Sequence, residues 1–388
     1  MFVPLSYNLK SLLVRRASTA LTVVSIGATV AVLAGVLSLQ QGFETLFKET
    51  GRADVAVFLR PGAGSEGESG ISREKADVLK KSLAEIALNA AGLPLASAES
   101  YLAVRMRKLD SGETNVPIRG VEPMTFEIFG DQIRVTAGQR LRPGTDEVIV
   151  GRKLTRRVRG CQLGEVITLN TTPFRVVGVF DCEGPFSSEI WGDLDRIADA
   201  LERPVYNRVI ARLKPGLDVQ AFAERMADHK DVPVKVQTER AYLADQTGAL
   251  SITLRVIGVF LATIMGVAAV FTSTNTMLAA LAARSHEIGI LLSVGFRPIP
   301  VFLSFMSEAL VLGLFGGVLG ILITLPLSGV ETGTTNWNTF TEVAFAFRVT
   351  PQVMKSAILF ALILGLFGGA LPAWRAARMD PVEALRRR

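Results

Sequence analysis

The sequence predicts a membrane protein with four transmembrane helices and one large folded domain outside the bilayer. Four apolar stretches lie near residues 19–39, 256–281, 301–327 and 353–373. Each approaches or exceeds the roughly 20 residues that a helix needs to cross a bilayer. The polar segment 42–249 separates the first stretch from the other three, and its strand and helix patterns predict an external α/β domain. The expected fold is therefore one helix, a large α+β domain, and then three helices.

The first apolar stretch contains no charged residue and follows Lys10, Arg15 and Arg16. These bases are also typical of the start of a signal peptide, and the paired arginines are typical of a twin-arginine signal. The apolar stretch is too long for such a signal, and no convincing small-x-small cleavage site follows it. We therefore expect an uncleaved membrane anchor.

Basic residues in the short segments predict which way the helices face, because cytoplasmic loops are enriched in Lys and Arg. The tail carries five arginines, and the loop before the third stretch carries Arg284 and Arg297. The last loop contains one arginine, Arg348, and two glutamates, so it has no excess of positive charge. Both termini and the loop 282–300 are therefore expected in the cytoplasm, and the large domain and the loop 328–352 outside. The expected division is an interfacial helix 1–18, spans 19–41, 250–281, 301–327 and 353–373, the external domain 42–249, a cytoplasmic loop 282–300, an external loop 328–352 and a cytoplasmic tail 374–388.

Composition excludes nucleic acid as a partner. The net charge of +6 and the pI near 9.5 could suggest it. However, the surplus bases lie beside the apolar stretches, and aromatic residues are not interleaved with them, as a nucleic-acid surface would require.

Small residues recur at four-residue spacing in the apolar stretches. Such spacing lets helix backbones approach closely, which matters in lipid because apolar burial does not drive helix association there. In the third and fourth stretches we expect packing within one subunit. In the first stretch a contact between subunits is an equal alternative. The residues concerned are Gly27, Ala31, Gly35, Gly313, Gly316, Gly317, Gly320, Gly365 and Gly369.

The external domain opens and closes with similar strand-helix-strand patterns. Alternating or apolar runs predict strands, and apolar residues spaced by three and four predict helices. The first βαβ-like unit covers 54–109 and the second covers 207–237. We expect them to form a membrane-proximal subdomain from 42–100 and 205–249, with a mostly β subdomain, 101–204, inserted. Strands of the insert are expected at 115–121, 147–150, 165–169 and 174–180.

Both cysteines fall in the inserted subdomain. If 165–170 and 173–180 form a hairpin that turns at residues 171–172, Cys161 and Cys182 lie opposite each other. They would occupy a non-hydrogen-bonded pair, where Cα atoms approach to about 4.5 Å, within disulfide range. An exported domain also lies in an oxidising compartment. The pattern predicts a structural disulfide unless a bulge near a flanking glycine shifts the register.

The residues of common catalytic and metal sites are missing from this sequence. It contains no G-x-x-x-x-G-K-[ST] phosphate loop, no C-x-x-C pair and no G-x-S-x-G elbow. His229 and His286 are expected on opposite sides of the membrane, which excludes a shared metal site. We therefore expect no catalytic, metal or cofactor site, and no enzyme activity in this chain.

The loop 282–300 predicts a short cytoplasmic helix. Ser285 is a candidate N-cap, Glu287 suits the positive helix start, and Gly295 with Pro298 would end it. A short, half-apolar helix of this kind rests on lipid headgroups or inserts into a partner's groove.

The tail and the amino terminus predict two further short helices on the same side. Asp380 is a candidate N-cap, Pro381 suits the first helical position, and Glu383 completes an arrangement similar to a capping box. Leucines of 1–18 form an apolar stripe suited to the membrane surface. Together the three helices would form a platform for a cytoplasmic partner.

These cytoplasmic motifs resemble the MacB/FtsX-type permease family, which includes LolC, LolE and DevC-like subunits. The similar segments are the run 275–297, the glutamate and glycine run 307–320 of the third span, and the tail 379–386 with Leu385. Segments of the external domain, such as 147–151 and 174–179, are similar to the periplasmic core of the family.

The resemblance implies the permease half of an ATP-binding-cassette transporter without a fused ATPase. Two copies of a separate ATPase would bind ATP and Mg²⁺, a second permease copy or paralogue would complete the dimer, and a periplasmic adaptor could join. ATP hydrolysis would move the periplasmic domain and so export or extract a lipoprotein, lipid, peptide or drug from the periplasm or the outer leaflet. The coupling helix would present Arg284, His286, Glu287, Ile288, Gly289, Leu291, Leu292 and Gly295 to the ATPase.

Two positions depart from the family pattern. The family commonly has a basic residue where this chain has Leu292, and often another at His286. The resemblance therefore implies a coupling contact that depends more on apolar packing. Glu308, an acid inside the third span, is expected to bond a neighbouring helix, with coupling of conformations or ion conduction as the alternatives.

Two other functions remain open from the sequence. An FtsX-like transducer would use ATPase strokes to activate a periplasmic hydrolase or receptor without transport. A membrane-anchored scaffold would need no ATPase. An ATPase and an adaptor encoded nearby would favour export, whereas a neighbouring hydrolase would favour the transducer.

Overall fold

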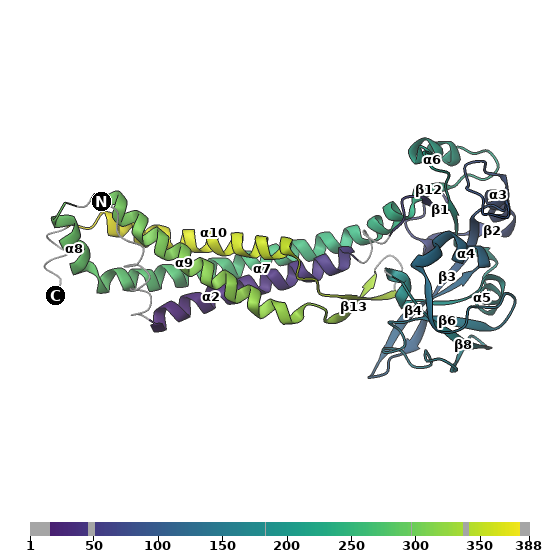
Figure 1. The fold of residues 1–388 in the computed structure, drawn as a ribbon, viewed down its shortest axis with the longest axis horizontal. Helices are drawn as coiled ribbons and strands as arrows, with labels where there is room; N and C mark the ends of the chain where they lie inside the picture. Colours follow the sequence, from purple (N-terminus) through teal and green to yellow (C-terminus); the bar gives the residue numbers. More distant parts are fainter. Residues whose placement is uncertain (1–15, 46–50, 183, 296, 337–340, 381–388) are drawn as a thin grey trace. The chain divides into compact units, whose positions relative to one another are not determined.

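The computed structural model describes residues 16–45, 51–182, 184–295, 297–336 and 341–380 (Figure 1). The expected interfacial helix 1–18 therefore lies almost wholly outside the described residues, as do Pro381, Glu383 and Leu385 of the tail. The chain divides into two compact units. One consists of Met1–Gly42, Ser251–Val330 and Ala346–Arg388, and the other of Phe43–Leu250 with Glu331–Phe345. We call them the span unit and the external unit.

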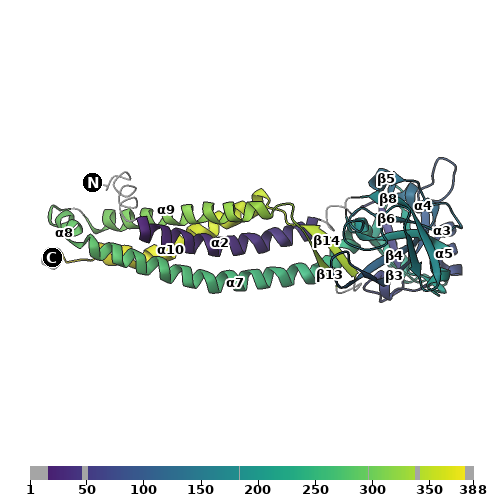
Figure 2. The same ribbon diagram turned by 90° about the horizontal axis from the view of Figure 1, so that it is seen from below.

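Four helices of the structure are long and apolar enough to cross a membrane, as the sequence predicts. The candidate spans are Arg16–Glu44, Ser251–Ala283, Pro298–Leu327 and Pro351–Ala377. The second belongs to a much longer helix of 45 residues, whose first turns lie in the external unit. Figure 2 shows these helices running along one another. The helices are α2 (Arg16–Glu44), α7 (Glu239–Ala283), α8 (Ser285–Ser293), α9 (Pro298–Thr324) and α10 (Pro351–Ala377).

Glycines allow α9 and α10 to pack backbone against backbone. A Cβ atom at Gly313 would lie 2.7 Å from the carbonyl oxygen of Ala361, and one at Gly365 would lie 2.7 Å from that of Ala309. Gly316 and Gly320 instead face Ile26 and Val30 of α2. A side chain at any of these positions would force the helices apart, so their small size sets the helix spacing.

The small residues of α2 divide between two environments. Gly27 packs against Leu319 and Gly316 of the same chain, whereas nothing lies within 4 Å of a Cβ at Gly35. The carbonyl oxygen of Ala31 accepts a hydrogen bond from Thr324. Part of this stripe therefore packs within the subunit, and the Gly35 end is open.

Hydroxyl groups add hydrogen bonds between the spans. Thr22 and Thr276 share a 2.7 Å bond that joins α2 to α7. The Thr274 hydroxyl donates to the carbonyl oxygen of Gly368, at 3.0 Å, which joins α7 to α10. In lipid such bonds contribute roughly 1 kcal/mol each.

The external unit contains a sheet of ten strands among its described residues, in the order β12-β1-β11-β3-β4-β9-β6-β8-β5, with β7 paired to β8. Strand β11 lies between β1 and β3, and β1 lies between β11 and β12. All three of these strand pairs are antiparallel. The two predicted βαβ-like units are thus confirmed, and they interlock as split βαβ units. The elements are β1 (Val55–Leu59), β2 (Ile71–Ser72), α3 (Arg73–Ser82), β3 (Ala96–Arg107), β4 (Glu113–Val121), α4 (Pro123–Phe129), β5 (Arg134–Gly138), β6 (Glu147–Gly151), β7 (Val166–Leu169), β8 (Thr172–Asp181), β9 (Ile190–Asp193), α5 (Leu194–Ala200), β10 (Val205–Tyr206), β11 (Arg208–Arg212), α6 (Val219–Ala227) and β12 (Lys235–Thr238).

Two hydrophobic cores lie along this sheet. One gathers β1, β11 and β12 with α3 and α6, around Phe58 and Phe222. The other gathers β4, β6 and β8 with α5, around Phe174 and Ile197. Strand β3 contributes to both cores, so the subdomain boundary expected at residue 101 falls inside one continuous strand.

Several short elements were not predicted. Helix α5 carries an N-cap signal, because the Asp193 side chain accepts from the backbone of Arg196. Strands β13 (Glu331–Asn336) and β14 (Thr341–Ala346) form a hairpin where we expected only a loop. The hairpin belongs to the external unit, and Phe345 packs edge-on against Phe43 at 5.2 Å. The first strand, β13, consists of threonine, glycine and other polar residues and lacks the alternation of apolar and polar residues that predicts a strand.

The predicted disulfide is wrong, because both cysteines are free thiols. Strands β7 and β8 do form the expected hairpin, but Leu169 pairs with Thr172, so the turn lies one residue earlier than predicted. Asn170 adopts the left-handed conformation, with φ of 51°, which asparagine tolerates better than most residues. Val166 consequently lies opposite Arg175, and the register no longer pairs the two cysteines.

Replacing Gly365 by Leu should destabilise the span unit. The new side chain would overlap the backbone of α9 at Ala309, and overpacking of this kind costs about 1–3 kcal/mol. Thermal unfolding of the purified full-length chain in detergent would measure the loss. Gly35→Leu is the matched control, since its Cβ has no neighbour within 4 Å. Equal destabilisation by both changes would contradict the packing described here.

Candidate functional site

Helix α8 lies directly after α7 and is the expected coupling helix. Arg284 separates the two helices, and its backbone is the N-cap of α8 without a side-chain capping bond. The prediction that Ser285 caps the helix is wrong. Its hydroxyl instead donates to the carbonyl oxygen of Ala282 at 3.0 Å, within the last turn of α7. Gly295, with φ of 97°, follows the end of the helix, as expected from a C-terminal glycine.

Arg284 forms a salt bridge with the buried acid of the third span. One guanidinium nitrogen lies 3.5 Å from a carboxylate oxygen of Glu308, and another lies 3.3 Å from Glu287. Only 3% of the Glu308 side chain and 13% of the Arg284 side chain are exposed. The guanidinium also lies 5.9 Å from the ring of Phe305. The acid was expected to bond a neighbouring helix, and the structure shows that its partner is the junction of α7 and α8.

The two faces of α8 differ sharply in exposure. Ile288 is buried among Met277, Leu281 and Phe305, so it anchors the helix rather than facing a partner. Gly289 is also buried and Leu292 is half-buried. The side chains of Glu287, Ile290 and Val294 are exposed, together with His286, and the first three are spaced to share one face. We call Glu287, Ile290 and Val294 the outer face of α8. Arg284, Ile288 and Gly289 are thus turned toward the other helices of this chain, and their contact with a partner stays a prediction.

The end of α10 shares the apolar cluster beneath α8. Ala373 and Ala376 are buried in the same cluster as Ile288, and Met379 packs against it. Asp380 is the last described residue of the tail. Helix α8 is thus supported from α7, α9 and α10 together.

The external unit contains a buried ionic network that the sequence analysis missed. The guanidinium of Arg119 donates to Glu66, Glu99 and Glu189 at distances of 2.7–3.0 Å. Arg208 donates to Glu99 at 2.7 Å and lies 3.3 Å from Glu66. All five side chains are almost completely buried. We call these five residues the buried ionic network.

The charges of this network support one another. Burial alone would raise the pKa of Glu66, but the guanidinium groups of Arg119 and Arg208 hold it below its usual value. Burial would likewise lower the pKa of Arg119, and the carboxylates of Glu189 and Glu66 raise it well above its usual value instead. Glu66 and Arg119 are therefore held in their charged forms, and removing a charged partner of either would leave a buried charge uncompensated.

The network is linked to the first turns of α7. The backbone N–H of Glu66 donates to the Tyr242 hydroxyl at 3.1 Å, and the Gln246 amide donates to the carbonyl oxygen of Gly64 at 2.9 Å. The Glu239 carboxylate accepts from the backbone N–H of Arg52 at 3.0 Å. These bonds fasten the start of α7 to the external sheet.

The only sequence signal for the network was the presence of charges within apolar strands. Arg119 lies in the buried second part of β4, from Val116 to Val121, and Arg208 begins β11, which is buried up to Ala211. The residues that bond to these arginines and to Glu66 are scattered along the chain from residue 66 to residue 242, so no short sequence motif marks the network. Among the described residues, no three His, Cys, Asp or Glu side chains gather as metal ligands would.

Breaking the Arg284–Glu308 pair should destabilise the junction of α7 and α8. Arg284→Gln leaves the Glu308 charge buried without its partner, which typically costs about 3–5 kcal/mol. Glu308→Gln in the same chain should restore part of that loss, because no charge then remains. Thermal unfolding of the two single variants and the double variant would measure the coupling. Simple additivity of the two losses would contradict a direct interaction.

The Glu239 carboxyl should make stability fall as pH rises. Burial raises its pKa from 4.5 to about 7. The folded chain therefore holds this proton more tightly than the unfolded chain. Its favourable contribution is complete below about pH 4.5, declines between about 4.5 and 7, and stays lost above that range. Glu239→Gln keeps the acceptor for Arg52 and should raise the unfolding free energy at pH 8 by roughly 3 kcal/mol, with little change at pH 4.5.

Chemical denaturation of the full-length chain at the two pH values would test this. Glu224→Gln is the control, since Glu224 is an exposed acid on α6. A benefit of Glu239→Gln that is the same at both pH values would contradict the assignment.

Comparison with known proteins identifies both parts of the chain. Residues 19–229 match the MacB-like periplasmic core domain, and residues 259–381 match the FtsX-like permease C-terminal domain. The chain is 25% identical over 287 residues to the macrolide export ATP-binding/permease protein MacB of Escherichia coli, covering 71% of this chain and 42% of that protein. It is 28% identical over 287 residues to MacB of Agrobacterium fabrum, covering 70% and 42%. The chain thus spans less than half the length of these curated relatives.

Solved structures give weaker matches. The periplasmic region of MacB from Actinobacillus actinomycetemcomitans aligns with a TM-score of 0.37 and 13% identity, covering 50% of this chain and 91% of that one. The extracellular domain of the transporter YknZ aligns with a TM-score of 0.35 and 14% identity, covering 47% and 98%. The match of the core-domain profile to more than half of the chain shows the family. This chain belongs to the MacB/FtsX-type permeases of ABC transporters, membrane proteins with a periplasmic core domain.

Proposed function

We propose that this chain is the permease subunit of an ATP-driven transporter that moves its periplasmic domain mechanically. The observation that carries the proposal is the continuity of α7. This one helix of 45 residues is bonded to the external sheet at its first turns and joins α8 at its other end. A continuous α-helix is stiff along its axis, so displacement at one end reaches the other.

The energy enters at the outer face of α8. Glu287, Ile290 and Val294 form an exposed, largely apolar patch on a helix that is braced from beneath by Ile288. Such a helix suits an apolar groove of another protein. We assign this groove to a separate ATPase, present in two copies, that binds ATP and Mg²⁺. A second permease copy, identical or paralogous, completes the assembly.

The orientation follows from the same assignment. An ATPase acts in the cytoplasm, so α8, the tail and the amino terminus lie on that side and the external unit lies in the periplasm. The bases of 282–300 and of the tail favour the same orientation.

The substrate is taken from the periplasm or the outer leaflet. The relatives are named as macrolide exporters with an ATP-binding part of their own. For this chain we extend the substrate class to lipoproteins, lipids, peptides or drugs, and a periplasmic adaptor fits the same scheme. Transport rather than signalling is proposed because the family relatives named above are exporters.

Changing the outer face of α8 should uncouple the ATPase without altering membrane insertion. Glu287→Ala combined with Ile290→Asp removes the charge and the apolar contact from the groove. Co-purification of the partner ATPase should fall by about tenfold, since losing two well-buried contacts typically costs more than 1.4 kcal/mol.

Ile299→Asp is the control, because Ile299 is exposed nearby at the start of α9 and is not part of α8. Membrane fractionation would verify insertion of every variant. Wild-type retention of the ATPase and wild-type transport by the double variant would refute the assignment of α8.

A further inference from the structure

Two strongly basic segments of the external unit stand apart from the function proposed above. Residues 105–108 carry three bases, and residues 152–159 carry five bases and no acid. We call the bases of these two segments the basic surface. A run of like charges is unfavourable unless water, salt or an anionic partner compensates it.

The fold brings the two segments side by side. The backbone N–H of Leu109 donates to the carbonyl oxygen of Arg157 at 2.9 Å, and that of Arg159 donates to Arg107 at 3.0 Å. Lys108 and Val158 are bridge partners in the same place. The bases of both segments therefore belong to one continuous surface.

Three exposed arginines of this surface form no ion pair among the described residues, and two further bases are only weakly paired. Arg105 lies 3.6 Å from Glu113 and Arg152 lies 3.3 Å from Asp181, both in exposed pairs. Such exposed pairs are weak. Within the described part of the chain, Arg107, Arg156 and Arg159 are exposed and form no ion pair with an acid.

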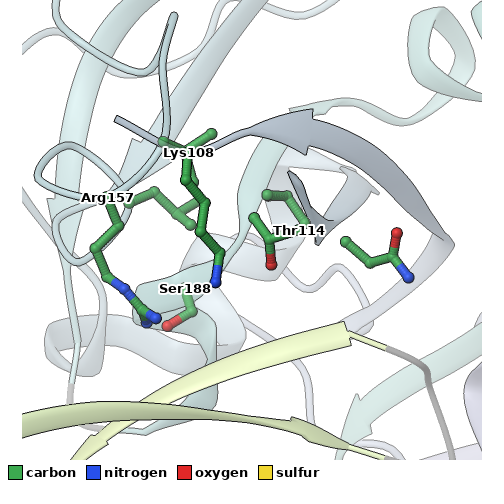
Figure 3. Close-up of a pocket in the computed structure, with 8 residues that line it drawn as sticks. Lys108, Thr114, Arg157 and Ser188 are labelled. Carbon is green, nitrogen blue, oxygen red and sulfur yellow. The ribbon is translucent and has the colours of Figure 1, made fainter. Parts of the chain in front are cut away.

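A small pocket opens within the basic surface. Figure 3 shows Lys108 and Arg157 extending toward Ser188, and all three line the pocket. Its space of about 10 Å³ is close to that of one water molecule, so it would admit a single oxygen atom. Ser188 is 2% exposed, and its hydroxyl has no hydrogen-bond partner among the described residues. An anionic oxygen would supply the missing partner between two cations.

A short connection joins this part of the external unit to the third candidate span. Lys153 of the basic surface lies near Glu331, the first residue of β13. Burial lowers the pKa of Lys153, and the negative charge of Glu331 opposes this shift. Glu331 follows only four residues after Leu327, the end of the third candidate span. Four residues reach at most about 14 Å. Glu331 is therefore tied by the chain to within about 14 Å of the end of that span, where lipid headgroups lie.

We propose that the basic surface binds phosphate groups of anionic lipids in the outer leaflet. The exposed arginines attract the lipid surface, and the pocket at Ser188 accepts one headgroup oxygen between Lys108 and Arg157. Each base near an anionic membrane adds to this attraction, which salt weakens. This lipid contact does not depend on the ATPase and can fail without affecting the proposed transport function.

The test uses the full-length chain in nanodiscs of phosphatidylcholine, with and without about 30% phosphatidylglycerol. Ser111→Cys, in a Cys161→Ser/Cys182→Ser background, carries a fluorophore at the tip between β3 and β4. Quenching by lipids with a nitroxide headgroup reports approach to the bilayer. We expect phosphatidylglycerol to increase quenching at least about threefold at low salt, and about 0.5 M salt to abolish the increase.

The variant Arg107→Glu/Arg156→Glu/Arg159→Glu should lose this increase. The matched control is Lys75→Glu/Lys214→Glu/Lys230→Glu, which reverses three exposed bases elsewhere in the external unit. Ser188→Ala should weaken the response without altering the fold. Equal quenching in both lipid mixtures, or an equal loss in the control, would overturn the proposal. Displacement by inorganic phosphate at constant ionic strength would also overturn it, because the site would then bind free phosphate.

Discussion

The buried ionic network is the interaction on which the external unit depends. Two arginines and three glutamates are removed from water beside the sheet strands β3, β4 and β11, and each guanidinium is bonded by carboxylates from different segments of the chain. Removing ions from water is costly, and attraction within the interior offsets the cost only where the geometry satisfies every charge. The strands that carry these residues are therefore held in one relative arrangement, from η2 (Glu66–Glu68) through β3 and β4 to β9 and β11.

The same network defines where α7 begins. Tyr242 and Gln246 bond to backbone groups at Glu66 and Gly64, so the helix start is part of the external unit. At the other end of α7, Arg284 pairs with Glu308 of α9. Helix α7 is thus hydrogen-bonded to the backbone beside the ionic network at its start, and an ion pair follows directly after its other end. Between them the spans depend on glycines and hydroxyl groups, because lipid provides no hydrophobic drive for helices to associate.

Local patterns predicted much of the external fold but not its details of register. Alternation at 55–59 and the apolar run of β8 identified strands, since the period of two is a property of the local chain. The turn of the β7–β8 hairpin was predicted one residue late, because its position depends on the backbone of Asn170. That single shift removed the predicted disulfide. In α8, the sequence indicated a helix but not which side of it was buried, because Ile288 and Ile290 are equally apolar.

The sequence by itself determined the number of spans, the position of the external domain and the presence of a short helix after the second span. These features follow from the length and periodicity of apolar runs, which are properties of each local segment and do not depend on the rest of the chain. Only the tertiary structure decided which charges meet. Arg119, Glu66 and Tyr242 are far apart in the chain, and Arg284 finds Glu308 only when α7 and α9 pack. Pairing of this kind depends on distance in space, which sequence separation does not encode, so the network and the junction of α7 and α8 emerged only from the folded chain.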